Sequence, residues 1–345
     1  NKNNQNKTIN LNVEEKPTGE IMAGGGFGTS GTTTTFGIKE NNYLGNGLRI
    51  DAKLDLSEES IKGKFSLRNP NYKNSDKSIF TNIQSSETNR LSDFGYKTNK
   101  TGFTFGTDFE YYDDLFLGVG INSYYENIET DSTASSQQQK LKGNYFDNFV
   151  SLSFDFDKRN QKFQTTQGYR NYFSTDLPLI SETNTVANTF ITTNYFEYFN
   201  NYLLKSSFYF RNSNSISGDN IKLSERLYLP QSRLRGFERG KVGPKDGNDF
   251  IGGNYIASLN LSSDIPKFLE NSQTTDLLIF LDIANVWGVD YDSGLESSDE
   301  IKSAIGIGLD WFSPIGPMNF SLSQHLSKGS NDVTESFRFN LGTTF

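Results

Sequence analysis

Apolar side chains occupy every second position over long stretches of this chain, and this pattern restricts the fold more than any other feature. In the stretch 48–56, one set of alternate residues is apolar and the other is charged: Leu48, Ile50, Ala52, Leu54 and Leu56 against Arg49, Asp51, Lys53 and Asp55. Successive side chains of a β-strand point to opposite faces. Similar stretches recur roughly every twenty residues, between clusters of Gly, Asn, Asp and Ser. The pattern predicts an all-β protein of antiparallel strands.

Alternation is shared by soluble sandwiches, which bury the apolar face, and by membrane barrels, which turn that face to lipid. Several stretches reach the ~9–11 residues that a tilted membrane strand needs, for example Lys97–Tyr111, Asp114–Glu126 and Asn184–Tyr198. Tight connections such as Tyr112–Asp113 and Asn200–Asn201 alternate with long polar ones such as Glu129–Gly143. Outer-membrane barrels have this alternation of short turns and long loops. These features favour a transmembrane β-barrel.

Composition agrees with a barrel and disfavours other classes. Only 34% of the residues are hydrophobic and mean hydropathy is −0.59, which excludes a bundle of transmembrane helices. Aromatic residues make up 14% of the chain and there are 31 glycines, as expected for strands with one lipid-facing side. The net charge of −8 argues against nucleic-acid binding. With 0 Cys and 1 His, His325, the chain has few groups for catalysis or metal binding, so we expect no enzyme, no metal and no cofactor.

We count about sixteen strands, an even number as closure of such a barrel requires. The later strands are expected at Tyr202–Asn212, Gly253–Ser262, Thr275–Trp287, Ile301–Phe312, Met318–His325 and Ser336–Phe345. A barrel of this size has a lumen too wide for strand side chains to fill. We therefore expect a plug or a pore.

The segment Glu225–Gly253 is the candidate plug. It carries six basic residues in an acidic protein, together with apolar residues that a solvated loop does not need. Strand parity turns Asn260, Asp282 and Asp310 toward the lumen. Because guanidinium binds carboxylate as a rigid fork, Arg235 is expected to reach Asp282, with Asp310 or Asn260 adding contacts. Gly236 allows the close approach. The alternative is a solvated basic loop at the outer surface.

Four motifs resemble the outer-membrane assembly-factor superfamily. RLRGFERGKVGPKDGNDFIGGN resembles its Arg-Gly-Phe loop, with Arg235, Gly236 and Phe237, and FLDIANVWG resembles the partner strand that carries Asp282. WFSPIGPMNFSLSQ resembles a turn near the family's C-terminus, and EEKPTGEIMAGGGFGTSG with NNYLGNG resembles the start of its barrel. The likeness runs in consistent order from about Asn10 to Phe345.

The resemblance implies a sixteen-stranded barrel of residues 20–345, preceded at 1–19 by the end of a periplasmic POTRA domain or a linker. It implies a bacterial outer-membrane protein that folds and inserts other β-barrels through a lateral gate between its first and last strands. Gate residues would be Gly24, Gly25, Gly26, Phe339, Asn340, Leu341 and Phe345. Implied partners are unfolded barrel clients, outer-membrane lipids, and accessory lipoproteins that dock mainly on POTRA domains missing here. A disulfide between positions 24 and 340 would then abolish activity.

The chain departs from the family at Asn260, where a Glu is frequent, so we expect Asp310 to substitute for the absent carboxylate. Alternative functions are a related translocation or secretion pore, of the TamA or two-partner secretion type, and a passive porin. The terminal Phe345 and the NVWG segment favour the assembly factor.

Overall fold

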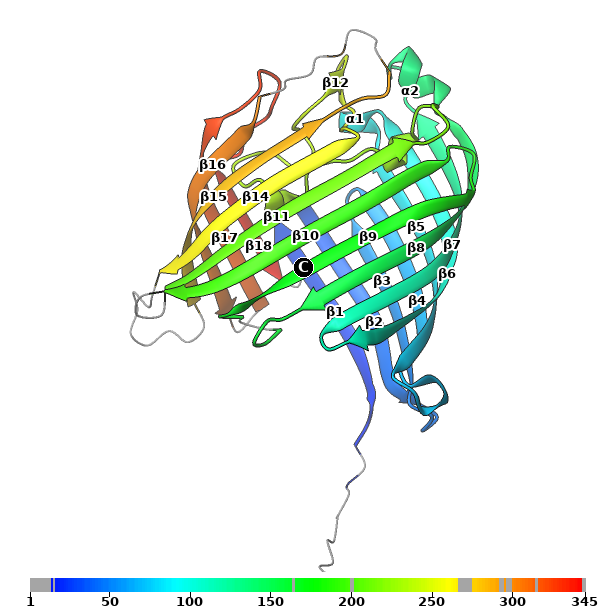
Figure 1. Ribbon diagram of the computed structural model, residues 1–345. Coiled ribbons are helices and arrows are strands. Elements are labelled where there is room, and N and C mark those ends of the chain that lie inside the picture. Colours follow the sequence, from blue (N-terminus) through cyan, green and yellow to red (C-terminus); the bar gives the residue numbers. More distant parts are fainter. Residues whose placement is uncertain are drawn as a thin grey trace, which may run out of the picture.

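The computed structural model describes residues 14, 16–162, 165–198, 202–265, 275–291, 295, 300–313 and 316–342. Within these residues, sixteen antiparallel strands close into a barrel (Figure 1). The barrel strands are β1 Gly19–Gly28, β2 Gly31–Tyr43, β3 Leu48–Ser57, β4 Ser60–Asn69, β5 Lys77–Arg90, β6 Tyr96–Tyr112, β7 Leu115–Thr130, β8 Gly143–Asp157, β9 Gly168–Ile180, β10 Thr185–Tyr198, β11 Tyr202–Ser215, β14 Tyr255–Ile265, β15 Thr275–Trp287, β16 Lys302–Ser313, β17 Gly316–Ser327 and β18 Phe337–Gly342.

Small elements lie in the connections. The described helices are α1 Leu91–Phe94, α2 Ser136–Lys140 and three 3-10 turns, Tyr72–Asn74, Leu223–Glu225 and Gln231–Arg233. Strands β12 Lys245–Asp246 and β13 Asp249–Phe250 form a separate short hairpin. Both α-helices and β12 lie at one end of the barrel, opposite the end at which β1 begins (Figure 1). Among the described residues, no helix is long and apolar enough to span a membrane.

The predicted fold is confirmed, with small shifts at the strand ends. The barrel strands pair in chain order, with β14 following β11 across an intervening loop and β18 closing the barrel on β1. The stretch Thr275–Trp287 coincides with β15, and Lys97–Tyr111 lies inside β6. Strand β1 begins at Gly19, one residue before the expected barrel boundary. Most of residues 1–18, and the expected turn Asn200–Asn201, lie outside the described residues.

The barrel wall is apolar on its outer face, as the alternation predicts. On β6, Phe103 and Phe105 are about half exposed, and on β16 so are Ile305 and Ile307. Ala304, which precedes Ile305 on the same strand and therefore faces the opposite side, is fully buried. An outer face of this kind is what a barrel presents to lipid.

Strands β1 and β18 close the barrel at a short seam. The register joins only Gly26 to Gly342, Phe27 to Leu341 and Gly28 to Asn340. The neighbouring pair β1–β2 aligns continuously from Gly19 to Gly28. Asn340 therefore lies opposite Gly28, so the disulfide considered between positions 24 and 340 does not fit this register, in which the two positions are offset by four residues.

Gly24 and Gly25 pair with β2, and their counterparts along β18 would fall beyond Gly342, outside the described residues. Phe345 is likewise outside them. On the outer face of the seam, the rings of Phe27 and Phe339 lie 5.7 Å apart. The described contacts between β1 and β18 thus occupy one short part of each strand.

Candidate functional site

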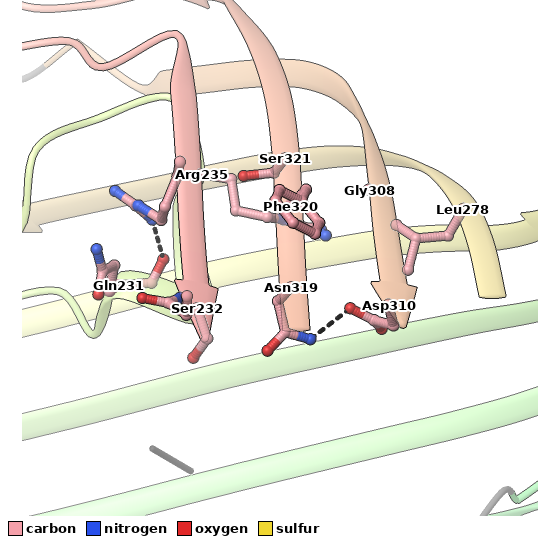
Figure 2. Close-up of a pocket in the computed structure, with 11 residues that line it drawn as sticks. Gln231, Ser232, Arg235, Leu278, Gly308, Asp310, Asn319, Phe320 and Ser321 are labelled. Atoms are coloured by element: carbon pink, nitrogen blue, oxygen red, sulfur yellow. Dashed lines mark hydrogen bonds between the residues drawn. The ribbon is translucent and has the colours of Figure 1, made fainter. Parts of the chain in front are cut away.

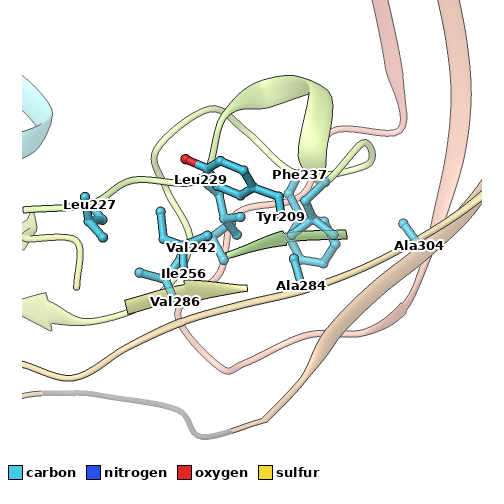
Figure 3. Packing of buried hydrophobic residues seen from close by; sticks show 10 residues of the cluster. Tyr209, Leu227, Leu229, Phe237, Val242, Ile256, Ala284, Val286 and Ala304 are labelled. Carbon is cyan, nitrogen blue, oxygen red and sulfur yellow. The ribbon is translucent and has the colours of Figure 1, made fainter. Parts of the chain in front are cut away.

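The connection between β11 and β14, residues 216–254, is the candidate site and is called the inserted loop below. Its apolar side chains Leu227, Leu229 and Phe237 are buried against lumen-facing residues of β11, β14, β15 and β16. Figure 3 shows these loop side chains packed toward Ile256, Val286, Ala284 and Tyr209. Burial of this kind supplies the hydrophobic free energy that holds an irregular segment inside a lumen. The alternative of a solvated surface loop was wrong.

Arg235 and Asp282 form the charged anchor of the inserted loop. Nε of Arg235 donates to Oδ2 of Asp282 at 2.7 Å, and Nη2 donates to Oδ1 at 2.8 Å. The backbone N–H of Arg235 also donates to Oδ2, at 3.0 Å. Asp282 is 0% exposed. This is the bidentate geometry in which guanidinium binds carboxylate most strongly.

The wall beneath the arginine is aromatic. The guanidinium carbon of Arg235 lies 3.5 Å from the ring centroid of Phe280, two residues before Asp282 on the same strand face. Gly306 on β16 leaves room for this ring, since a Cβ there would lie 2.4 Å from it. A cation over a ring face gains further electrostatic stabilisation. Arg235 is thus fixed both by its charge partner and by a stacking surface.

Asn260 completes the anchor in place of a carboxylate. Its Nδ2 donates to Oδ1 of Asp282 at 2.8 Å and to the carbonyl oxygen of Arg233 at 2.9 Å. Arg233 in turn donates to the hydroxyl of Ser207 on β11 at 2.8 Å. An amide suits this position because the neighbouring carboxylate needs a donor, which a second carboxylate could not provide.

Gly236 has a backbone conformation that disfavours other residues. Its φ is +88°, in the left-handed region. An added Cβ would lie 3.1 Å from Cβ of Ala304 and 3.2 Å from Cβ of Ser323. The position therefore needs glycine for both its backbone angle and its contact with the barrel wall.

Phe237 is 1% exposed and forms a β-bridge with Thr334, in the connection between β17 and β18. On either side of it, the N–H of Glu335 donates to the carbonyl of Gly236, and the N–H of Glu238 donates to that of Val333. The inserted loop is therefore joined by main-chain hydrogen bonds to the segment that leads into the last strand.

Asp310 does not take part in the anchor, and the expectation that it substitutes for the absent Glu was wrong. Its Oδ1 accepts from Nδ2 of Asn319 at 2.6 Å on the neighbouring strand. Figure 2 shows Asp310 with Asn319 on the far side of the cavity from Arg235. Strand parity specifies which face a side chain occupies, but Asp310 is opposite Asp276, well along the barrel from Asp282.

A buried lysine at the base of the loop was missed from the sequence. Nζ of Lys222 contacts Asp147, and lies 3.5 Å from Glu126 and 3.3 Å from Glu225. Burial alone would lower the pKa of Lys222, but Glu225, Glu126 and Asp147 outweigh it and raise the pKa above its ordinary value. The ammonium is therefore charged and ties the loop to β7 and β8. Lys222 precedes the basic stretch and lies in no strand, so neither charge clustering nor parity indicated it.

Arg338 on β18 was also missed, although its outward neighbours Phe337 and Phe339 would have assigned it to the lumen. Its Nη2 donates to the carbonyl of Phe237 at 2.6 Å, and its Nη1 to that of Gln231 at 3.2 Å. Glu335 balances its charge at 2.8 Å. The last strand thus holds the inserted loop directly.

The described side chains give little support for a metal site or a catalytic site. No group of three or more His, Cys, Asp or Glu suited to a metal occurs among the residues that the structure describes. His325 lies on β17 opposite Ala304. What the arrangement offers is a rigid plug attached to several strands and to the seam.

Comparison with known proteins places this arrangement in a recognised class. The model of the Omp85 superfamily domain matches residues 42–345. The outer membrane protein assembly factor BamA of Neorickettsia risticii is 24% identical over 355 residues, covering 99% of this chain and 47% of that protein. BamA of Neisseria meningitidis serogroup B is 30% identical over 139 residues, covering 32% of this chain and 17% of that protein. The chain thus spans about half the length of the first of these relatives.

Solved structures show the same fold. BamA from Haemophilus ducreyi lacking POTRA domains 1–3 superposes with a TM-score of 0.86 at 22% identity, over 95% of this chain and 70% of that one. CdiB from Escherichia coli superposes less well, with a TM-score of 0.59 at 12% identity over 96% of this chain and 63% of that one.

Proposed function

We propose, since this chain belongs to the Omp85 superfamily of bacterial outer-membrane barrels, that it folds and inserts other β-barrel proteins into the outer membrane. The observation that carries the proposal is the seam. Between β1 and β18 the described register has three residue pairs, whereas β17 and β18 share five and β1 and β2 share ten. A wall with one weak junction between otherwise continuous strands is suited to opening there.

An opened seam would expose the edge of β1, whose backbone N–H and C=O groups can pair with an incoming strand. Gly24, Gly25 and Gly26 weaken β1 because they contribute no side-chain packing and retain backbone freedom. The work is the templating of backbone hydrogen bonds, for which no nucleophile, metal or cofactor is needed. We therefore assign no catalytic residue.

The inserted loop would keep the lumen closed and the wall near the seam rigid while β1 moves. Its anchor at Asp282 lies on β15 and its attachment at Arg338 lies on β18, so the loop braces the strands on one side of the seam. A passive porin needs an aqueous channel, and the buried loop side chains occupy that space. The plug favours an assembly factor over a porin.

Unfolded barrel proteins and outer-membrane lipids are the partners proposed for the barrel itself. Residues 1–18, which precede β1, are proposed to be the end of a POTRA domain or a linker, and accessory lipoproteins are proposed to bind mainly to such domains. The gap in length between this chain and its curated relatives leaves room for them.

Reconstitution of the full-length natural protein in liposomes tests the proposal. Urea-unfolded client barrels should fold faster with it than in empty liposomes, and planar bilayers should show nearly closed or flickering currents. Large steady openings without faster client folding would indicate a porin. Passage of a polypeptide across the bilayer without client insertion would indicate a secretion pore.

A further inference from the structure

Gln231 of the inserted loop contacts both edges of the seam. Its side-chain Nε2 donates to the hydroxyl of Ser30, in the turn that joins β1 to β2, at 2.6 Å. Its main-chain carbonyl accepts from Nη1 of Arg338 on β18, at 3.2 Å. One residue of the loop therefore connects the first hairpin of the barrel to the last strand.

The two connections differ in strength. The Arg338 side is the stronger of the two, because Arg338 is 6% exposed and its guanidinium also binds the carbonyl of Phe237 and the carboxylate of Glu335. The Ser30 side is a single hydrogen bond between neutral groups in an exposed setting. Neutral bonds are weaker than charge-assisted ones. When the seam opens, the bond to Ser30 should therefore be the one that breaks.

The surroundings leave Gln231 room to move. Two cavities, of about 540 and 510 Å³, lie on either side of it. The first is lined by residues of β15–β18, among them Asp310 and Asn319, and appears in Figure 2 with Gln231 at its edge. The second is lined by β1–β4, including Ser30. Asn340 of the seam lines both.

We propose that Gln231 is a positioning residue that latches the seam shut by holding the β1–β2 turn against the loop. While the loop is seated by Arg235 and Arg338, the Gln231 side chain restrains Ser30 and so opposes separation of β1 from β18. Release of this bond removes the restraint that the Gln231 side chain places on the first hairpin and leaves the loop attached to β18. The inference rests on the proposed opening of the seam during client insertion.

The latch can be removed from either partner. Ser30→Ala deletes the acceptor, and Gln231→Ala deletes the donor and keeps the main-chain carbonyl that Arg338 binds. Spin labels on Ile38→Cys of β2 and Leu322→Cys of β17 report the seam width, because both side chains point outward and are more than half exposed. Pulsed electron paramagnetic resonance on the full-length protein then gives the open fraction. Ser217→Ala is the matched control, because it removes a hydroxyl of the same loop that bonds locally, to Asp219.

Each single variant should increase the open population about three- to fivefold, as expected for the loss of one neutral hydrogen bond. The double variant should open no further than either single, because all three lack the same bond. Unchanged distances in Ser30→Ala would overturn the proposal, as would single effects that multiply in the double variant.

Client folding by the unlabelled wild type is measured in parallel. Distances that respond to Ser30→Ala without any client folding would support the latch and reject the proposed function.

Discussion

Arg235 of the inserted loop and Asp282 of β15 are joined by two side-chain hydrogen bonds and one backbone hydrogen bond, on a carboxylate that is fully buried. Removal of one partner from a buried pair leaves the other charge uncompensated, which costs about 3–5 kcal/mol. Arg235→Ala should therefore make the loop accessible to cleavage by added protease, and should lower the urea concentration at which half of the barrel is unfolded.

Arg235→Lys should recover only part of the loss, because an ammonium cannot reproduce the two parallel bonds of the fork. Arg239→Ala is the matched control, since this arginine lies in the same loop, is largely exposed and lies 3.9 Å from Glu59. Equal protease protection in wild type and Arg235→Ala would show that the pair does not hold the loop.

Gly236→Ala should destabilise the loop through two separate effects. A non-glycine residue at positive φ costs about 1–2 kcal/mol, and crowding against Ala304 and Ser323 adds about 1–3 kcal/mol. Gly247→Ala isolates the first effect, because Gly247 has φ of +63° with nothing near an added Cβ. Thermal unfolding of both variants should show the larger loss for Gly236→Ala. Equal losses would mean that the contact with the barrel wall is unimportant.

Asn260→Glu should weaken the anchor. The substitution removes the two donors that reach Asp282 and the carbonyl of Arg233, and adds a second negative charge beside a buried carboxylate. We expect a loss of at least about 2 kcal/mol in the free energy of unfolding. Ser262→Glu, at the next lumen-facing position and opposite Lys205, is the control and should be tolerated. A more stable Asn260→Glu barrel would show that a carboxylate fits this network.

Lys222→Met should loosen the base of the inserted loop, since it leaves Glu126 and Asp147 buried without their cation. The expected cost is about 3–5 kcal/mol, measured by unfolding. Lys140→Met on α2, an exposed lysine near the same end, is the control. No difference between the two variants would argue against the buried cluster.

The same lysine predicts a pH dependence. The pKa of Lys222 is raised in the folded protein. Its contribution to stability is therefore complete below the pKa that it has in the unfolded chain, and is lost only as pH rises through the pKa that it has in the folded protein. Protease protection of the loop in wild type should therefore be constant from about pH 7 to about pH 10. Release of the loop near neutral pH would contradict this charge assignment.

The barrel was largely predictable from the sequence because alternate residues on a strand must face opposite sides. Strand parity also predicted that Asp282 faces the lumen, which made it the expected partner of Arg235. Parity does not predict where along the barrel axis a side chain lies. Asp282 is opposite Ala304, and Asp310 lies six residues further along the same strand, about 20 Å away. By parity alone, Asp282 and Asp310 are therefore equally good partners for Arg235, although only Asp282 pairs with it.

The contacts of the loop were less accessible to sequence reasoning. Arg338 alternates with outward Phe337 and Phe339 and so could have been assigned to the lumen, but its acceptors are main-chain carbonyls of an irregular segment. Gln231 binds Ser30 across some two hundred positions of sequence, and neither residue belongs to a pattern that marks it. Such contacts depend on the loop path, which periodicity does not describe.

The register of the seam also specifies a crosslink. Phe27 lies opposite Leu341, so Phe27→Cys with Leu341→Cys should form a disulfide in the closed seam. Gly24→Cys with Asn340→Cys should not, because Asn340 is opposite Gly28, about 13 Å from Gly24. Ala52→Cys with Phe65→Cys, an opposed pair within the continuous wall of β3 and β4, controls for oxidation of the barrel.

Client folding by the crosslinked full-length protein in liposomes is the most direct measurement of the central claim, that the seam opens during assembly. Oxidised Phe27→Cys/Leu341→Cys should lose most of its folding activity and recover it on reduction, and the Ala52→Cys/Phe65→Cys control should stay active in both states. Undiminished client folding with the seam fully crosslinked would contradict the claim.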